Sequence, residues 1–287
     1  MKELVVFMVS AGPNVFKENI KDTYESISKN LGHSDFWWYI VVDKKEEKEF
    51  VLNLIPEKHL LKIVDSVGSW AQDFNLFFDK YLNEGQYLLI VQDDIVVDTP
   101  DFYIQSKKEI EKFENKIAWI TYTNTQYYSV NAHNSIRGGL YKDRKSFQRC
   151  ECHREDGVKE YPHGPVKVFG PFIHIMLIKS SIMKELGKCP DWTLYVMLID
   201  EHWCLKALTK NYFNVWIPNI FYRHPNPSQV LKRRFNLRFE KEGHVGFRSE
   251  WGFDCPPTDE EINTLVAKYP SLSSVANKYS YEWDYLK

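Results

Sequence analysis

The sequence has no apolar run of the roughly 20 residues that a bilayer-spanning helix needs. Residues 1–10 contain a short apolar stretch, without the long apolar region and small-residue cleavage site of a signal peptide, so we expect a first strand there. The sequence also has no N-x-Ser/Thr site and only five cysteines, an odd number. These absences favour a cytoplasmic protein with free thiols.

A surplus of charge of one sign is also lacking, since 37 Lys and Arg residues face 39 Asp and Glu residues, for a formal net charge of −2. Dedicated nucleic-acid binders carry a basic surplus, so the average charge does not favour that class. No strand pattern is followed by the G-x-G-x-x-G motif of dinucleotide-binding dehydrogenases. The 287 residues are 44% hydrophobic, which excludes wholesale disorder and allows one large domain or two small ones.

Aromatic residues, in contrast, make up 15% of the chain. Those at 36–39 and in a helical stripe over 70–81 fall in predicted core elements. The rings after about residue 127 interleave with charged residues instead. That mixture suits an extruded base or a sugar, and it does not decide between them.

Strand and helix patterns alternate over the first 125 residues, which predicts an α/β fold with a mostly parallel sheet. The pattern returns after a long polar segment, and the last 60 or so residues are mixed. Strands are predicted at 4–9, 36–42, 60–64, 87–91, 95–97, 172–178 and 213–217, and helices near 16–31, 69–82, 180–186, 200–209 and 259–268, with a charged helical stretch after residue 43.

Two carboxylates, Asp93 and Asp94, follow Gln92 directly at the end of the predicted strand 87–91. Ligands of open α/β sheets bind at the carboxyl ends of the strands. Adjacent carboxylates repel each other, and a cation relieves that repulsion. Oxygen ligands suit Mg²⁺ or Mn²⁺, which in turn bind phosphates, so we favour a metal site over a solvated acidic turn.

A second acidic pair, Asp200 and Glu201, falls in the first turn of a predicted helix. Acids there also interact well with the helix dipole, so a structural capping role stays open. His224 follows the last predicted strand, and an isolated histidine is more often structural than a metal ligand.

The order of these motifs over residues 4–226 resembles the GT-A type of nucleotide-sugar glycosyltransferase, specifically the inverting family 2. Tyr39-Ile-Val-Val-Asp43 is similar to the family's strand whose acid holds the nucleotide base, and Gln92-Asp93-Asp94 looks like its Asp-x-Asp motif with the first acid replaced. The helix that begins Ile199-Asp200-Glu201-His202 is similar to the helix that carries the family's catalytic base. Ile199 and His202 replace acids of that motif.

The resemblance implies a fold, a reaction and a set of site residues. It implies a GT-A domain over 1–226, with an acceptor-side loop at about 124–168, and a C-terminal extension over 227–287 that packs on the same domain. It implies Asp200 as the base, with Glu201 as the next candidate, and Asp94 and His224 as ligands of Mn²⁺ or Mg²⁺. The implied donor contacts are Ser10, Ala11, Asp43, Ser69, Trp70, Asn75, Gln92 and Asp93.

In the implied reaction a sugar passes from a nucleoside diphosphate, UDP by preference, to an acceptor hydroxyl with inversion. A divalent ion would stabilise the charge on the leaving diphosphate, and one carboxylate would take the acceptor's proton. The acceptors left open are a glycan, a lipid-linked saccharide and a modified nucleic-acid base. Other functions left open are a sugar nucleotidyltransferase, and a carbohydrate- or nucleotide-binding protein of the same fold without turnover.

The segment at 124–168 has no regular pattern, and loops this long within a domain are usually functional or mobile. It contains Cys150, Cys152 and His153, whose side chains are of the kinds that bind zinc, although their spacing matches no zinc module and favours an ordinary loop. The basic stretches at 137–154 and 223–248 suit either a solvated surface or an anionic ligand, namely a diphosphate, a nucleic acid or a lipid carrier.

Overall fold

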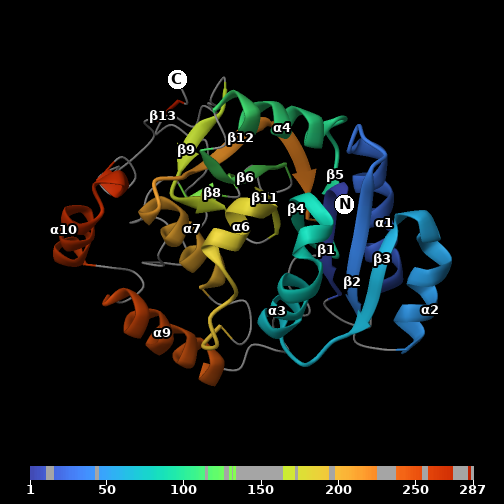
Figure 1. The fold of residues 1–287 in the computed structure, drawn as a ribbon, viewed down its shortest axis with the longest axis horizontal. Helices are drawn as coiled ribbons and strands as arrows, with labels where there is room; N and C mark the ends of the chain where they lie inside the picture. Colours follow the sequence, from blue (N-terminus) through green and yellow to red (C-terminus); the bar gives the residue numbers. More distant parts are fainter. Residues whose placement is uncertain are drawn as a thin grey trace.

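The computed structural model describes residues 1–10, 16–42, 45–113, 116–125, 129–130, 132–133, 164–171, 174–193, 198–224, 237–253, 258–273 and 284–285. Its strands are β1 Lys2–Val9, β2 Phe36–Val42, β3 Leu60–Asp65, β4 Gly85–Gln92, β5 Val96–Val97, β6 Ile117–Asn124, β7 Ser129–Val130, β8 Ala132–His133, β9 Val166–Val168, β10 Gly170–Pro171, β11 Ile175–Lys179, β12 Phe213–Arg223 and β13 Asp284–Tyr285. Its helices are α1 Phe16–Asn30, α2 Lys45–Leu54, α3 Trp70–Tyr81, α4 Phe102–Lys112, α6 Ser180–Leu186, α7 Ile199–Thr209, α9 Leu237–Trp251 and α10 Asp259–Lys268 (Figure 1).

Eleven of the described strands form one sheet in the order β13-β9-β12-β6-β11-β4-β1-β2-β3, with β5 paired to β12 and β7 to β6. β4, β1, β2 and β3 run parallel, and β6 and β12 run parallel to each other. β11 is antiparallel to both β4 and β6, so β6 and β12 point the same way as β4. The predicted α/β fold is confirmed, and the sheet is mixed, because β5, β7, β9 and β11 run antiparallel to their neighbours. The ends of β1, β2, β4 and β12 lie at one edge, which we call the carboxyl edge.

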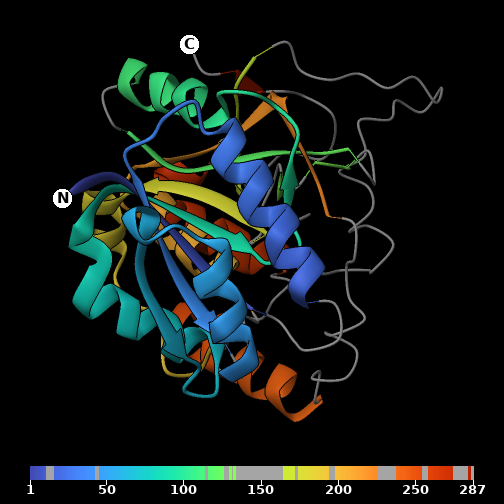
Figure 2. The ribbon, with the colours of Figure 1, turned by 90° about the vertical axis from the view of Figure 1, so that its right-hand side faces the viewer.

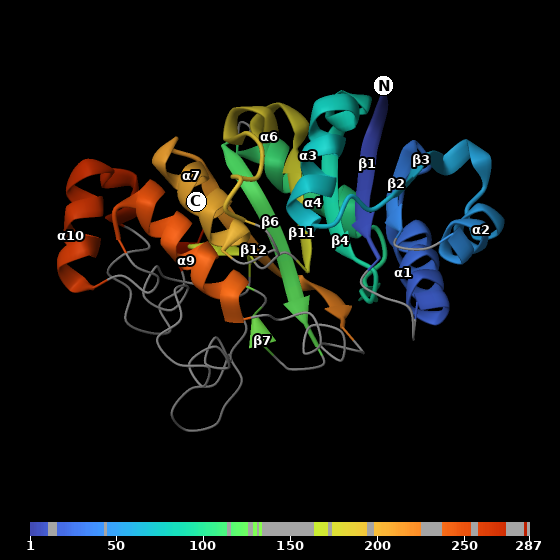
Figure 3. The same ribbon diagram turned by 90° about the horizontal axis from the view of Figure 1, so that it is seen from below.

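The core lies on both faces of the sheet, because successive side chains of a strand point to opposite faces. In β1, Val5 and Phe7 belong to one buried cluster, and Leu4, Val6 and Met8 to the other. The first cluster is covered by α3, α6 and α7, which lie together in Figures 1 and 3. The second is covered by α1, α2 and α4, and Figure 2 looks toward α1 and α2. No helix among the described residues is long and apolar enough to cross a membrane.

Local patterns account for the best-predicted elements. The apolar run of β2 is almost entirely buried and spans the predicted residues. α3 forms because its aromatic residues recur on one stripe, and Ser69 caps it by accepting a hydrogen bond from the backbone N of Gln72. α10 starts with a capping box formed by Thr258 and Glu261.

Several elements depart from the predictions. The sequence patterns assigned no strand to β6, although all eight of its residues are buried, nor to the short strands β7, β8, β9, β10 and β13. They also assigned no helix to α4 or α9, whose apolar positions alternate with many charged ones. β12 was predicted to end at Ile217, yet it continues through Pro218 to Arg223. Its register with β6 shifts between Ile217 and Phe221, and such an irregularity accommodates a proline within a strand. Thr123 Oγ1 supports the shift by donating to the carbonyl of Pro218 at 2.8 Å.

The described helices of the C-terminal extension pack on the first core cluster. Phe247 of α9 and Ile262 and Leu265 of α10 belong to the same buried cluster as Phe7 of β1. Gly246 of α9 packs closely against Trp192. A Cβ atom added at this glycine would lie only 2.3 Å from the Trp192 side chain.

Candidate functional site at the carboxyl edge

Asp94 and His224 meet at the carboxyl edge. Asp94 lies just beyond β4 and His224 directly after β12, and His224 Nε2 is 2.8 Å from Asp94 Oδ2. Only 13% of the Asp94 side chain and 5% of the His224 side chain is exposed. They come together because β5 pairs antiparallel with the end of β12, with Val96 opposite Arg223. The two residues implied as metal ligands therefore form a buried pair.

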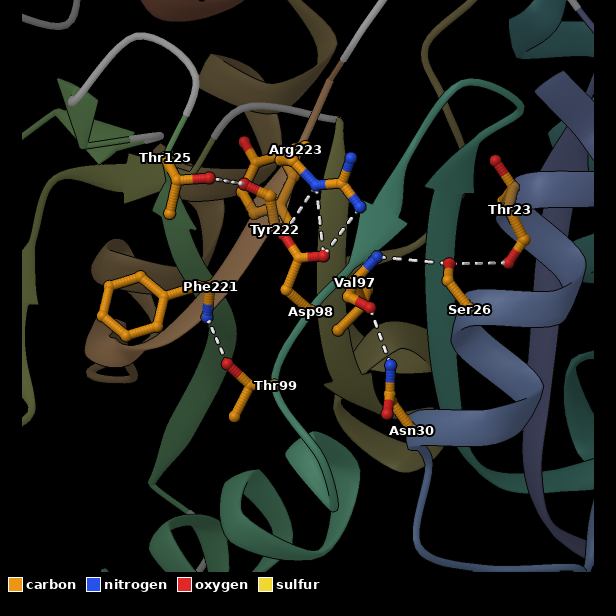
Figure 4. Close-up of polar contacts among 10 residues, drawn as sticks. All are labelled: Thr23, Ser26, Asn30, Val97, Asp98, Thr99, Thr125, Phe221, Tyr222 and Arg223. Carbon is orange, nitrogen blue, oxygen red and sulfur yellow. Dashed lines mark hydrogen bonds and ion pairs between the residues drawn. The ribbon is translucent and has the colours of Figure 1, made fainter.

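A polar face of α1 supports the turn that carries Asp93 and Asp94. Thr23 Oγ1 donates to the carbonyl of Asp93 at 2.8 Å and accepts from the backbone N of Ile95 at 3.0 Å. Ser26 Oγ accepts from the backbone N of the second residue of β5 at 3.2 Å, and Asn30 Nδ2 donates to that residue's carbonyl at 2.7 Å (Figure 4). No sequence motif marks these three residues as part of the site, although their spacing of three and four positions places them on one helix face.

Replacing Thr23 with Val is expected to lower the free energy of unfolding by about 1–3 kcal/mol. The change keeps the shape of the side chain but leaves a backbone carbonyl and a backbone N–H without their partner at a fully buried position. Urea unfolding of the wild type and the variant measures the difference. Thr23→Ser keeps the hydroxyl and serves as the control, so an equal loss in both variants would contradict the supporting role.

His174 is a third residue of this site, next to His224. The sequence patterns place it inside the predicted strand 172–178, so it was not predicted as a site residue. It precedes β11, its carbonyl accepts from the backbone N of Gln92 at 3.0 Å, and its ring centroid lies 4.6 Å from that of His224. Burial, and then the nearby His224, lower the pKa of His174 to about 3, so it is neutral. The signal that could have identified His174 is its position as a titratable residue directly before the apolar run 175–178. The structure extends β11 to Lys179, and residues 172 and 173 lie outside the described residues.

Asp200 and Glu201 occupy the first turn of α7, as predicted. Both are buried, and the backbone N of Glu201 donates to Asp200 Oδ1 at 3.3 Å. Burial, the charge of Asp200 and a side-chain hydrogen bond with it raise the pKa of Glu201 well above its usual range, which favours the protonated form of Glu201. Since α7 leads into β12 and packs on it, its first turn lies toward the end of β12 that carries His224.

His202 attaches α7 to α9. Its Nδ1 accepts a hydrogen bond from Nε1 of Trp251 at 3.2 Å, and the ring of Trp192 contacts it edge-on. Burial lowers the pKa of His202 to about 3, so its role is that of a neutral packing residue.

The implied donor contacts lie in different surroundings. Ser10 follows β1, and its Oγ is buried without a hydrogen-bond partner in the described structure. Ser69 and Asn75 line a cavity of about 180 Å³ between the start of α3 and residues 190–193. The Asn75 amide also donates to the carbonyl of Cys189 and accepts from its backbone N, at 3.0 and 2.9 Å. Trp70 packs among the core rings, stacked on Phe74.

Several predicted features lie outside the described residues. They are Ala11 and Asp43, the cluster of Cys150, Cys152 and His153, and most of the loop at 124–168 with its basic stretch. Within the part that the structure describes, no three His, Cys, Asp or Glu side chains are grouped so as to hold a metal ion. A metal ion held by the Asp94–His224 pair would therefore need ligands in addition to these two side chains.

Comparisons with known proteins identify the fold. No protein-family model and no curated protein sequence matches the chain. Solved structures of three glycosyltransferases do match: GalNAc-T7 with UDP, GalNAc and Mn²⁺ at 13% identity and a TM-score of 0.56, the mannosyltransferase PcManGT from Pyrobaculum calidifontis with GDP-Man and Mn²⁺ at 12% and 0.58, and residues 1–349 of S. aureus TarS with UDP-GlcNAc at 11% and 0.55.

The matches cover 94%, 96% and 96% of this chain, so they extend over the whole fold rather than one motif. The chain spans 55% of the GalNAc-T7 chain and 74% of each of the other two. At these identities the likeness shows the fold alone. The protein has the GT-A fold, as predicted.

Proposed function

We propose that the protein is a metal-dependent glycosyltransferase that moves a sugar from a nucleoside diphosphate sugar to an acceptor hydroxyl with inversion. The observation that carries the proposal is the Asp94–His224 pair, which lies at the carboxyl edge of a GT-A fold just beyond β4. The carboxyl edge is where open α/β sheets bind their ligands. UDP is the favoured donor nucleotide, since two of the three matched structures hold UDP or a UDP-sugar.

The side chains of this pair fit one divalent ion. A carboxylate oxygen of Asp94 and the imidazole Nε2 of His224 lie 2.8 Å apart and would both be available to hold the same ion. Carboxylate and imidazole ligands suit Mn²⁺, and Mg²⁺ is the alternative. When bound, the ion would neutralise charge on the leaving diphosphate. Phosphate oxygens of the donor would complete the ligand set.

The carboxylates of α7 supply the base. The acceptor oxygen attacks the anomeric carbon, the bond from that carbon to the diphosphate oxygen breaks, and the acceptor's proton passes to a carboxylate. We assign this role to Asp200, because the raised pKa of Glu201 favours its protonated form, which does not accept a proton. Glu201 is assigned to orient Asp200, whose Oδ1 accepts from the backbone N of Glu201 at 3.3 Å.

The proposal assigns residues 1–226 to the transferase domain and 227–287 to an extension packed on it. We also propose a cytoplasmic location. The supporting observation is that Cys189 and Cys204 are buried free thiols, the form that a reducing compartment maintains. A sugar hydroxyl is the favoured acceptor. A nucleic-acid acceptor has no observation in its favour, because Arg223 is ion-paired to Asp98 and the stretch at 137–154 lies outside the described residues.

Calorimetry with UDP tests the proposal. UDP is expected to bind in the presence of Mn²⁺ and to bind far more weakly after chelation, since two protein ligands alone make an incomplete site. Binding of a nucleoside triphosphate in preference to UDP would favour the sugar nucleotidyltransferase instead. Mn²⁺-dependent UDP binding without any donor turnover would favour a binding protein of the same fold.

A further inference from the structure

A second side-chain pair lies beside the proposed metal ligands on the short β5–β12 ladder. Arg223 directly precedes His224, and its guanidinium holds Asp98 with two prongs: Nε lies 2.8 Å from Oδ2, and Nη2 lies 2.8 Å from Oδ1 (Figure 4). The side chains are 50% and 38% exposed. Ion pairs that are this exposed contribute little to the free energy of unfolding. The two-pronged contact does, however, fix the orientation of the Arg223 side chain relative to Asp98.

The end of β12 alternates strictly in burial. Tyr222 and His224 are buried, whereas Arg223 between them is exposed. Adjacent residues of a strand point to opposite faces. His224 therefore reaches Asp94 on the buried side, while Arg223 reaches Asp98 on the exposed side, and together they limit rotation of the strand end about its axis.

β12 needs such a restraint because its pairing with β6 is irregular just before this point, between Ile217 and Phe221. Strands with such irregularities are bent, and the pairing with β6 resumes only at Phe221 and Tyr222, where β6 ends, so β6 does not hold the residues after Tyr222. β5 contributes only two residues. The nearest other bonds are those that the carbonyl of Tyr222 accepts from the backbone N and Oγ1 of Thr125, at 3.0 and 3.3 Å (Figure 4). Further back, the backbone N of Asp98 donates to the carbonyl of Phe221 at 3.0 Å, and the backbone N of Phe221 donates to Thr99 Oγ1 at 2.8 Å. None of these bonds involves the side chains of Arg223 or His224.

We propose that Asp98 and Arg223 are a positioning pair that holds His224 in place as a metal ligand and so sets the affinity for the divalent ion without touching it. This inference rests on the proposed function. It assigns Arg223 to the ion pair with Asp98 rather than to an anionic ligand.

The affinity for Mn²⁺ tests whether Asp98 and Arg223 position His224. It is measured at saturating UDP from the electron paramagnetic resonance signal of free Mn²⁺. Asp98→Asn and Arg223→Gln are each expected to weaken Mn²⁺ binding about tenfold, the lower end of what residues behind the ligands contribute. Arg223→Lys keeps the charge but loses the two-pronged geometry, so it should lie between wild type and Arg223→Gln. The exchange of both residues, Asp98→Arg with Arg223→Asp, should recover most of the affinity.

Asp35→Asn is the matched control. It removes an ion pair with Lys2 at 2.8 Å, with side chains 47% and 32% exposed, at the opposite end of β1, and it should leave Mn²⁺ affinity unchanged. Wild-type affinity in Asp98→Asn, or an exchange variant no better than the single variants, overturns the positioning role. The positioning role is also overturned if UDP binding is weaker in Arg223→Gln but not in Asp98→Asn, since Arg223 would then contact the diphosphate. A wild type that binds no Mn²⁺ with UDP overturns the proposed function and this assignment with it.

Discussion

Replacing Asp200 with Asn is expected to slow sugar transfer by about 10²- to 10⁴-fold, the usual effect of removing a general base. Asn keeps the size of the side chain but cannot take the acceptor's proton. Because Asp200 is not a proposed metal ligand, Mn²⁺-dependent UDP binding should persist in the variant. The donor for the assay is first chosen by a thermal-shift screen of sugar nucleotides with Mn²⁺, since a specific ligand raises stability by mass action.

Glu201→Gln is the informative partner of this variant. Burial and the charge of Asp200 raise the pKa of Glu201 and favour its protonated form, and Gln is similar in size and also able to donate a hydrogen bond. We therefore expect the loss of activity to stay within about tenfold, well below that of Asp200→Asn. Initial rates of UDP release with saturating donor and acceptor compare the two. Near-normal transfer by Asp200→Asn would remove Asp200 from the mechanism, and a larger loss in Glu201→Gln would exchange the two roles.

His224→Ala is expected to weaken Mn²⁺-dependent UDP binding by on the order of 10²-fold or more, since losing a direct ligand should exceed the 10- to 100-fold effect of losing a residue behind one. The substitution also leaves Asp94 at a position with only 13% of its side chain exposed and without its 2.8 Å partner. Asp94→Asn should have a comparable effect through loss of the carboxylate. Calorimetry with UDP at fixed Mn²⁺ measures both variants.

His59→Ala serves as the control for this experiment. His59 lies just before β3, at the opposite end of the strands from the carboxyl edge, and packs edge-on against Phe36. Its removal should leave UDP binding unchanged. Equal losses in His224→Ala and His59→Ala would point to general destabilisation, and wild-type binding by His224→Ala would exclude His224 from the metal site.

The accuracy of the sequence predictions follows the range of the interactions involved. β2 and α10 span the predicted residues, and α3 differs by one residue at each end, because an apolar run, a capping box and an aromatic stripe are local signals. β12 was predicted too short because a proline normally ends a strand pattern, and the irregularity that accommodates it depends on β6 and on Thr123. His174 was treated as one more strand residue, since its proximity to His224 is a long-range contact.

The sequence by itself determined that strands and helices alternate and that acidic residues follow β4 and open α7, because these features arise within a few neighbouring residues. Only the tertiary structure decided which of those residues meet. The β5–β12 pairing brings His224 to Asp94, α1 supplies the hydroxyl of Thr23 to the turn that carries Asp94, and burial raises the pKa of Glu201. Register and burial depend on segments far apart in the chain, so no local pattern of residues encodes them.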